Sequence, residues 1–479
     1  MKNRRGSSRF SRRRFLSSSG LTLAGLGLAS MLPGPLVRRA LAAGPTSDNR
    51  FMFIFLRGGN DGVNSLIPHG DVDYSWTNRE HLYIAPENAI ALNGFASFHP
   101  GLAGMMDGYN AGELAAIHQV GYPDQSRSHF NGQRIWENGD PTQPFSVSGW
   151  LARYLVENGV TAGYEVPVLS VQTREPIILR GSDEYLNVAD PDHFDFSLPF
   201  LSEPLKSKII DSWPPQYEGL AGGQPYGPIL RATSIELDKF VSNFGAWDQG
   251  NWDPKDPDNP TWSLFPVDYA TNPEDPAGPG GKKFSSEAYG FFLNLKICAL
   301  ALLESNPSNN ANGTRIAGTE LQGFDLHTNQ GALGGRHNEL LSWLAYGQRS
   351  LRLALSGLAI DPRSYTSVWG KTVVATFSEF GRTSMANGGG NGTDHGKGSC
   401  MWLHGGPVQG GVYNCDASTW DPGTLFSDSD RYIRYQTDYR SIFWEMLRDH
   451  MGADPATVET IFPGYTSQGL ASQEMGLIA

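Results

Sequence analysis

Val373-Val-Ala-Thr-Phe-Ser-Glu-Phe-Gly-Arg-Thr383 is the stretch of sequence that says most about the fold. Its first four residues, β-branched and apolar, predict a buried strand. A carboxylate, Glu379, and a guanidinium, Arg382, follow this strand, and a glycine-rich segment comes next at Gly392-Thr-Asp-His-Gly-Lys-Gly398. Open α/β sheets carry their chemistry outside the carboxyl ends of their strands. The sequence therefore predicts a functional site where this strand ends.

Apolar runs and helical patterns alternate along the rest of the chain. Continuous apolar runs predict buried strands at Phe51–Leu56, Leu114–Val120 and Val166–Val171, and a last strand begins at Met401. Helical patterns cover residues 102–113, 128–136, 284–304, 336–357 and 438–451. This alternation predicts βαβ units, and so an α/β fold with a mainly parallel sheet flanked by helices.

Residues 185–283 differ in composition from the rest of the chain. Proline and aspartate dominate two parts of this segment, 252–260 and 272–279. The composition predicts an insertion or lid with one helix near 230–244. Asp253, Asp256 and Asp258 offer oxygen ligands for calcium, but prolines interrupt their spacing, so a solvated loop is favoured over a calcium site.

The first 42 residues have the features of a twin-arginine export signal. Ser11-Arg-Arg-Arg-Phe-Leu16 has the twin-arginine form, an apolar stretch follows at 21–32, and Ala40-Leu-Ala42 offers small residues for cleavage. A basic membrane anchor or nucleic-acid-binding arm would also be basic, but the apolar stretch is short and glycine-rich for a spanning helix. We expect the twin-arginine export machinery to deliver residues 43–479 to the periplasm or the medium, with no stable membrane insertion after cleavage. Because this route carries folded proteins, it hints at an inserted metal.

Charge and cysteine content exclude several classes of function. The leader holds nine basic and no acidic residues, so the rest of the chain has 28 basic and 49 acidic residues, a formal net charge of −21. Such a protein repels nucleic acids and anionic membranes. Cys298 lies in an apolar run, and Cys400 and Cys415 flank a glycine-rich turn that a disulfide could close. Three cysteines give little support to thiol or zinc-finger chemistry.

Two polar segments follow the first two predicted strands. Asp61 comes after the first strand in a glycine-rich turn and offers a carboxylate to a cation, although an Asn-Asp-Gly turn alone would also explain it. Ser126-Arg-Ser-His129 follows the second strand at the start of a helix. A serine there meets the positive end of the helix dipole, and Arg127 can neutralise an oxyanion. Helix capping would explain Ser126 or Ser128, but it leaves Arg127 and His129 without a role.

Two further segments lie in the second half of the chain. Asp325 and His327 are two apart in an extended segment, so their side chains face the same side and suit one cation. A hydrogen-bonded Asp–His pair outside a metal's ligands is the alternative. Asp394 and His395 sit among glycines that let backbone approach a ligand closely. His395 is a candidate metal ligand, with Asp394 either a ligand or a group that orients it.

Taken together, these groups predict a metal site. Mixed carboxylate and imidazole ligands suit zinc, manganese or iron better than calcium. We expect one or two divalent ions, zinc or manganese, and an anion held by Arg127 or Arg382. The sequence contains no P-loop, no dinucleotide fingerprint after the first strand and no Gly-x-Ser-x-Gly elbow. The expected ligands are Asp61, Asp325, His327, Glu379, Asp394 and His395, and the expected catalytic residues are Arg127, Ser128, His129 and Arg382.

The same residues carry a resemblance to a known family. With the twin-arginine leader, the ordered motifs resemble the exported bacterial family catalogued as domain of unknown function 1501, over residues 51–452. That family is similar in layout to the alkaline-phosphatase and sulfatase superfamily. The motifs are Leu56–Gly62, Ser126–Phe130, Gly323–His327, Phe377–Thr383, Thr393–Gly396 and Thr437–Arg440.

The resemblance implies an alkaline-phosphatase-like fold and a role for each motif. Asp61 would be the metal ligand after the first strand, and Ser128, or else Ser126, would be the nucleophile. Asp325 and His327 would serve a second metal, Glu379 would begin the superfamily's Asp-His pair, and His395 would be its last histidine. Two departures stand out. Phe380 occupies the place of that pair's histidine, which leaves one metal site short of a ligand, and the Asp325–His327 spacing is shorter than in the phosphatases.

The sequence thus predicts an exported metal-dependent hydrolase of phosphate or sulfate esters that uses Ser128 as nucleophile. Its substrate would be a small or glycan-linked anionic ester. The alternative is a non-catalytic protein that binds a glycan or envelope component in the same pocket. A metal-dependent oxidoreductase is the least supported class.

Overall fold

The central strand of the protein is β1 (Arg50–Arg57), which is buried along almost its whole length in the computed structural model. Phe51, Phe53 and Phe55 point into one hydrophobic core, and Met52, Ile54 and Leu56 point into the other. A strand that is buried on both faces needs such a continuous apolar run. The structure describes residues 48–159, 166–182, 184–189, 251–268, 270–271, 283–304 and 314–479. The leader and most of the predicted insertion, with its helix near 230–244, lie outside these residues.

In the described part of the chain, nine strands form a mixed sheet that is mostly parallel. Its order is β11-β5-β10-β9-β1-β8-β6-β7, with β12 also paired to β5. Only β10 runs antiparallel, against both β5 and β9, and the other pairs are parallel. The strands are β5 (Leu114–Gly121), β6 (Val168–Val171), β7 (Leu186–Val188), β8 (Ile316–Gln322), β9 (Thr372–Ser378), β10 (Ser399–His404), β11 (Gly411–Tyr413) and β12 (Thr437–Asp438).

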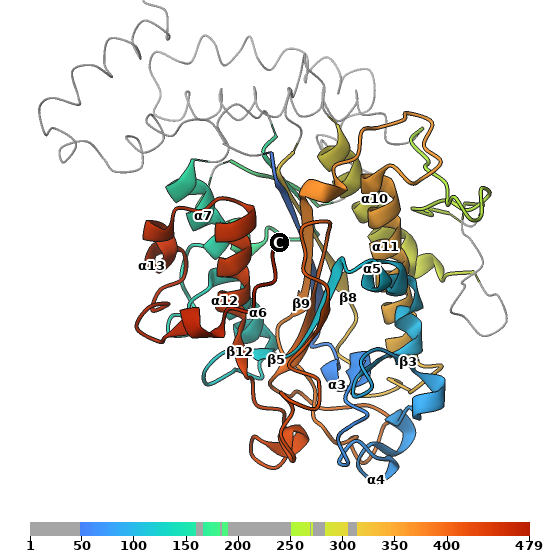
Figure 1. Cartoon of the computed structure of the whole chain (residues 1–479), viewed down its shortest axis with the longest axis vertical. Helices are drawn as coiled ribbons and strands as arrows, with labels where there is room; N and C mark the ends of the chain where they lie inside the picture. The colour runs from blue at the N-terminus through green and yellow to red at the C-terminus, as the bar shows by residue number, and fades with distance from the viewer. Residues whose placement is uncertain are drawn as a thin grey trace, which may run out of the picture.

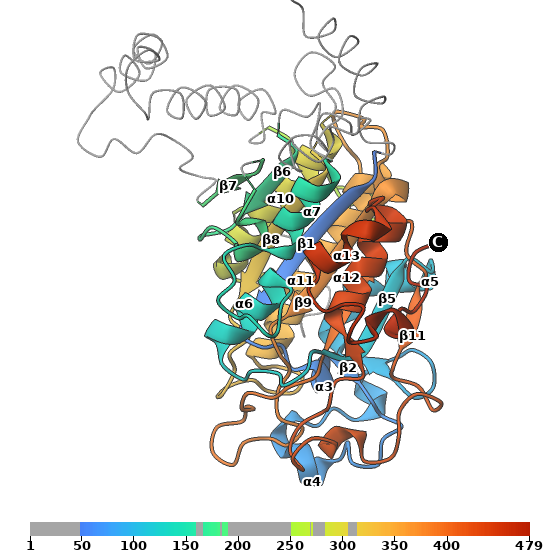
Figure 2. The ribbon, with the colours of Figure 1, turned by 90° about the vertical axis from the view of Figure 1, so that its left-hand side faces the viewer.

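Helices cover both faces of the sheet, which stands between them in Figure 1. On one side lie η4 (Pro100–Met105), α5 (Met106–Asn110), α10 (Tyr289–Leu303) and α11 (Arg336–Ser356). Figure 2 shows the helices of the other side in front of the sheet. These are α6 (His129–Asn138), α7 (Trp150–Asn158), α12 (Tyr439–Glu445), extended by a π-helical turn at Met446–His450, and α13 (Val458–Ile461).

Short elements complete the described part of the chain. A three-stranded sheet combines β2 (Leu66–Ile67), β4 (Ser97–Phe98) and β3 (Ile90–Ala91). The remaining short helices are α3 (Gly62–Ser65), α4 (Trp76–Arg79), η2 (Glu80–Leu82), η3 (Pro86–Asn88), η5 (Ile177–Leu179), η7 (Ser286–Ala288), η8 (Trp369–Lys371), η9 (Thr424–Phe426), η11 (Pro455–Thr457) and η12 (Leu470–Gln473).

The α/β class predicted from the sequence is therefore confirmed. The strand predicted from Met401 is not the last one, because β11 and β12 follow it, and β7 was not predicted. β10 is antiparallel, so the sheet is mixed. Strand β8 was not predicted, because Gly318 and Glu320 interrupt its apolar run. Contacts with β1 explain both residues. A Cβ at position 318 would lie 2.0 Å from the ring of Phe53, so only glycine fits there, and Glu320 pairs with Arg57 at 2.9 Å.

The topology brings the predicted site segments to one edge of the sheet. β5 and β9 are both antiparallel to β10, so they run in the same direction, which β1 and β8 share. The carboxyl ends of β1, β5, β8 and β9 therefore meet at one edge, and the amino end of β10 joins them there. The residues that follow these four strands, and those that precede β10, are the ones that carry the predicted chemistry.

Two further features concern the interior. The stretch Ser286–Leu303 is long and apolar enough to cross a membrane, but 72% of it is buried inside the protein, as in a core helix. All three cysteines are buried and free, so no bridge joins Cys400 to Cys415.

Candidate metal centre

Asp325 is the focus of the polar cluster at the carboxyl edge. It lies in the loop after β8, and three histidine rings turn their Nε2 atoms toward its carboxylate. His129 Nε2 is 3.3 Å from Asp325 Oδ2, while the Nε2 atoms of His327 and His395 are 3.0 and 3.2 Å from Asp325 Oδ1. His327 Nε2 and His395 Nε2 are 3.0 Å apart. Three segments that are distant in the sequence thus meet at one carboxylate.

The other nitrogen of each ring, Nδ1, is held by an acceptor. His129 Nδ1 contacts Glu379 Oε1 at 2.9 Å, and His395 Nδ1 contacts the carbonyl oxygen of Arg127 at 2.8 Å. His327 Nδ1 contacts Asp394 Oδ1 at 3.2 Å. Carbonyl and carboxylate oxygens only accept hydrogen bonds, so each Nδ1 can donate to its partner. With Nδ1 protonated and a cation between Asp325 and the rings, each Nε2 lone pair would face the cation, which is the orientation of histidines that bind a metal.

Hydrogen bonds and neighbouring charges fix the two carboxylates that anchor this arrangement. Burial works to raise the pKa of Asp325, but the hydrogen bond and charge of Arg382, 2.7 Å away, lower it to about 2. Glu379 is fully buried, which also works to raise its pKa. The hydrogen bonds that it accepts from His129, Gln133 and the Gly58 amide reverse this and lower the pKa. Both groups are therefore carboxylates at neutral pH.

The imidazoles respond to the same charges. Burial works to lower the pKa of His129, but the hydrogen bond and charge of Glu379, and the charge of Asp325, raise it. Burial lowers the pKa of His395, and the charges of His129 and Arg382 act in the same direction. These directions describe the cluster without an added cation.

The donor set fits a divalent metal ion. One ligand atom each from His129, Asp325 and His395 lie within 4.8 Å of one another, the one such group in the described ranges. His129 Nε2 is buried and makes no hydrogen bond. Tetrahedral zinc with bonds of about 2.0–2.1 Å has ligand atoms about 3.3 Å apart, close to the distances around Asp325. Two imidazoles and one carboxylate leave a position open for water or substrate, and His327 stands beside them.

Phe380 forms the apolar wall behind these ligands. Its ring is fully buried, and its centroid lies 4.9 Å from that of His129 and 5.0 Å from that of His395. The residue thus packs against both imidazoles and restricts their orientation. Phe380 has no atom that could bind a metal, so it adds no ligand for a second ion. The described residues therefore provide one compact ligand group.

Arg382 and Asp61 are occupied elsewhere. Arg382 is 2% exposed, and besides Asp325 its guanidinium donates only to backbone carbonyls, those of residues 58, 59, 324 and 393. It therefore orients Asp325 and offers nothing to a substrate. Asp61 caps α3, and its carboxylate is buried against Arg79 and Gln330. The structure does not bring Asp61 to the cluster.

An open pocket of about 570 Å³ lies over the cluster. Its lining comes from Arg127 and Ser128 before α6, from His327, Asp394 and His395, and from Arg431. Ser128 is the exposed N-cap of α6, and its side chain makes no capping hydrogen bond. The pocket thus combines a hydroxyl at a helix N-terminus, two guanidinium groups and two of the imidazoles.

Two features of the site were missed in the sequence. His129 was expected to act in catalysis and proves to be one of the three closest candidate ligands; its place at the start of a helix after a strand end was the available signal. Arg431 lies between η9 and β12 in a segment without a motif, so nothing in the sequence connected it with Asp394, which it contacts at 2.7 Å.

Fold and site together define an α/β protein with a mixed, mostly parallel sheet and a histidine–carboxylate cluster at the carboxyl edge. The family model described as a protein of unknown function (DUF1501) matches residues 309–421. This match supports the family resemblance, and its range contains Asp325, His327, Glu379, Asp394 and His395 but neither Ser128 nor His129. No curated protein and no solved structure gives a significant match to the chain.

Proposed function

We propose that this protein is a metal-dependent hydrolase of phosphate or sulfate esters. The observation that carries the proposal is the convergence of three imidazole Nε2 atoms on Asp325 while each Nδ1 is held by an acceptor. Each ring is thereby oriented at both nitrogens, as in histidines that bind a metal. The two guanidinium groups that line the pocket would attract an anionic substrate.

His129, Asp325 and His395 would hold one ion, zinc or manganese, with His327 as a nearby fourth group. A bound ion of this kind polarises an ester oxygen and lowers the pKa of a coordinated water or alcohol. Glu379 and the Arg127 carbonyl would keep two imidazoles in the ligand orientation, and Arg382 would do the same for Asp325. Such supporting partners contribute strongly to metal affinity.

Arg127 is the best candidate to bind the anionic group of the substrate. Its guanidinium contacts the hydroxyl of Tyr432 and lies 5.0 Å from the centroid of that ring. Among the described residues it forms no ion pair, whereas Arg431 is paired with Asp394. A guanidinium without a carboxylate partner, in a protein with a large excess of carboxylates, is available to a phosphate or sulfate group.

Ser128 is the candidate nucleophile. Its hydroxyl lies in the pocket at the amino end of a ten-residue helix, where the dipole favours a negatively charged oxygen. Attack by Oγ would transfer the phosphoryl or sulfuryl group to the serine and release the alcohol. Water would then displace the serine and release the anion. Ser126 is a poorer candidate, because its Oγ accepts a hydrogen bond from the Ser128 amide at 3.2 Å.

Turnover of p-nitrophenyl phosphate and p-nitrophenyl sulfate by the metal-loaded protein tests this function. We expect hydrolysis of at least one ester, a loss of about 100-fold or more with Ser128→Ala, and little change with the matched control Ser126→Ala. Metal-bound protein that hydrolyses neither ester would overturn the proposal. That result would favour the alternative, a non-catalytic protein that binds an envelope component or glycan in the same pocket.

Two broader parts of the proposal rest on the sequence. The order of the site segments along the sheet edge supports a relationship to the alkaline-phosphatase-like fold, with residues 185–283 as an insertion. Residues 1–42 support export to the periplasm or the medium. Retention of the full-length protein in the cytoplasm after Arg12→Lys and Arg13→Lys would support the export route, and unchanged export would contradict it.

A further inference from the structure

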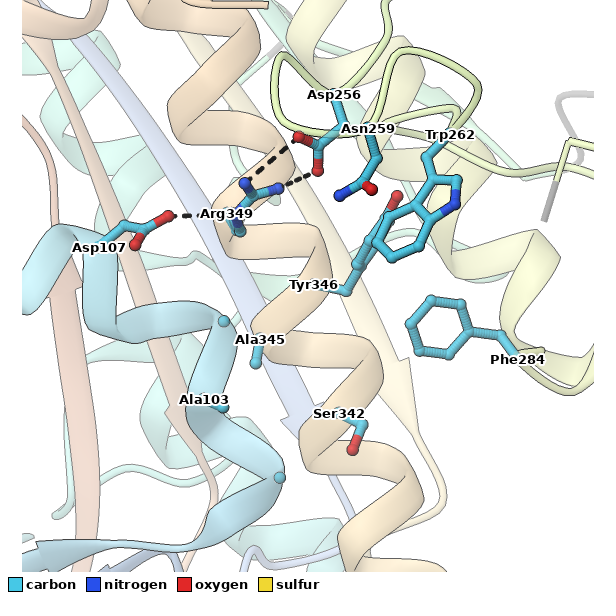
Figure 3. Close-up of a pocket in the computed structure, with 12 residues that line it drawn as sticks. Ala103, Asp107, Asp256, Asn259, Trp262, Phe284, Ser342, Ala345, Tyr346 and Arg349 are labelled. Carbon is cyan, nitrogen blue, oxygen red and sulfur yellow. Dashed lines mark hydrogen bonds and ion pairs between the residues drawn. The ribbon is translucent and has the colours of Figure 1, made fainter. Parts of the chain in front are cut away.

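A second pocket, of about 280 Å³, lies beside α11 on the face of the sheet that this helix covers. Figure 3 shows it between α11, the 3-10 helix η4 and the segment 256–262. None of the residues that line it lines the pocket over the metal centre. Its volume is just below the range of about 300–1,000 Å³ that is usual for small-molecule sites. A ligand of this pocket would therefore be small.

Arg349, Asp107 and Asp256 make up the charged wall of this pocket, and Arg349 also holds Asp258, which lies outside the lining. Arg349 contacts Asp107 at 3.1 Å, Asp258 at 2.9 Å, and Asp256 through two nitrogens. Asp256 is 1% exposed, so its carboxylate is stabilised by the ion pair with Arg349 and not by water. The aspartates considered as calcium ligands are thus otherwise engaged: Asp256 and Asp258 bind Arg349, and Asp253 binds Lys255 and Ser263.

The opposite wall is aromatic. Trp262, Phe284 and Tyr346 line it, and the rings of Phe284 and Tyr346 meet at a centroid distance of 5.0 Å. Tyr346 is fixed by a hydrogen bond from its hydroxyl to the Ser263 carbonyl at 2.6 Å. Rings that are held in place present an apolar surface whose C–H contacts cost little entropy.

Two polar groups in the pocket have no partner within the described part of the chain. Ser342 is 3% exposed, and its Oγ is buried without a hydrogen bond. The side-chain amide of Asn259 also makes no hydrogen bond with any described residue. A buried hydroxyl without a partner costs free energy, which a ligand with hydrogen-bonding groups would recover.

We propose that this pocket binds a single neutral sugar residue. A pyranose ring offers C–H groups to the aromatic wall and hydroxyls to Ser342, Asn259 and the Asp256 carboxylate. An organic cation would use the same rings, but Arg349 already engages all three carboxylates that would attract it. A neutral ligand with donors and acceptors on its rim fits this combination better.

Ligand-observed NMR of the purified protein tests the proposal, with methyl glucoside, methyl galactoside and N-acetylglucosamine as probes and choline as the cationic comparison. We expect saturable binding of at least one sugar, weakened about tenfold or more by Trp262→Ala and by Asn259→Ala. Trp76→Ala is the matched control, because Trp76 is 58% exposed on α4 and lines neither pocket.

Thermal melting of each variant shows whether it is folded. If the Trp262 variant is misfolded, the Asn259 variant still tests the proposal, because the Asn259 side chain makes no hydrogen bond within the described chain and its loss should not disturb the fold. Three results would overturn the proposal: no saturable binding of any sugar, binding that neither substitution weakens, or saturable binding of choline alone. The readout is sugar binding, so it does not depend on hydrolysis at the metal centre.

Discussion

Glu379 shows how one buried carboxylate can determine a site that it does not enter. It lies under the cluster with no exposed surface and accepts hydrogen bonds from His129, Gln133 and the Gly58 amide. Phe380, the next residue, packs against His129 and His395. The segment after β9 therefore supports the ligands from below, although the sequence suggested that it supplied one.

Replacing Glu379 with glutamine tests this supporting role. The amide keeps the shape but loses the charge that fixes the Nδ1–H tautomer of His129, so metal affinity should fall about 10–100-fold. Competition with a coloured chelator measures it. Asp394→Asn is the matched control: it alters the partner of His327, which stands beside the compact group, and its effect should be smaller. Equal affinities in the wild type and the Glu379 variant would refute the role of Glu379.

Asp61 gives the contrasting prediction. Its partner Arg79 has no exposed surface, so Asp61→Asn leaves a buried charge uncompensated and should destabilise the protein by about 3 kcal/mol or more. Metal content at low temperature should stay unchanged. Asp48→Asn, at a surface pair with Lys371, should cost no more than about 1 kcal/mol. Denaturant unfolding measures the stability, and metal analysis measures the bound ion. If the Asp61 variant loses metal but not stability, Asp61 is a metal ligand and this prediction is wrong.

At the residue scale, the sequence predicted which side chains reach the edge but not how they pair. Asp61, Asp325 and Glu379 each follow a strand and look equivalent in the sequence. Their roles differ because Arg79 arrives at Asp61 from α4 and Arg382 arrives at Asp325 from beyond β9. Neither encounter leaves a pattern in the sequence, since both depend on how loops pack at the edge.

Among the elements, the turn after β1 is the one that positions the cluster most directly. Gly58 has a φ of +118°, and a Cβ there would lie 2.4 Å from the Asp325 amide nitrogen. The missing side chain thus lets the ends of β1 and β8 approach each other closely. The distance between the two loops, and with it the position of Asp325, depends on this glycine.

Gly58→Ala should therefore affect both stability and metal binding. Gly94→Ala is the control, because Gly94 also has a positive φ, +82°, but has open space where a Cβ would lie. We expect the control to lose about 1 kcal/mol from backbone strain alone. The Gly58 variant should lose more than the control and should bind metal more weakly. Thermal melts and chelator competition measure the two effects, and matching losses in the two variants would show that the close approach does not matter.

At the element scale, long apolar runs made the central strands and the flanking helices predictable. β8 and the direction of β10, in contrast, depend on their neighbours in the sheet. β8 carries Gly318 and Glu320, which are unusual in a buried strand. Gly318 makes room for the ring of Phe53 on β1, and Glu320 pairs with Arg57 on the same strand. The direction of β10 depends on the path of the glycine-rich segment before it, which returns the chain to the sheet at the carboxyl edge of β9.

For the molecule as a whole, buried histidines make stability depend on pH. Burial lowers the pKa of His99 and His118 to about 4 and that of His337 and His404 to about 3. The unfolded chain binds protons at these groups near pH 6.5 and the folded protein does not. The stability is therefore fully present above about pH 6.5 and falls as the pH is lowered toward about 4.

The free energy of unfolding should accordingly decrease between about pH 7 and about pH 5, by up to about 1.4 kcal/mol per histidine for each pH unit below 6.5. The denaturant midpoint should decrease with it. His118→Gln should reduce this dependence, and the exposed control His81→Gln should not. A midpoint that stays constant over this range would show that these rings are protonated in the folded protein.

The central claim for the whole molecule is that one metal ion sits at the meeting point of β5, β8 and the segment before β10. Mass spectrometry of the metal content can decide it, on protein that has been equilibrated with zinc or manganese and freed of unbound ion. We expect one ion per chain in the wild type and in Asp61→Asn, and none in His129→Ala, Asp325→Ala or His395→Ala. Protein that retains neither metal, or that keeps its metal in all three alanine variants, would show that the cluster is not a metal centre.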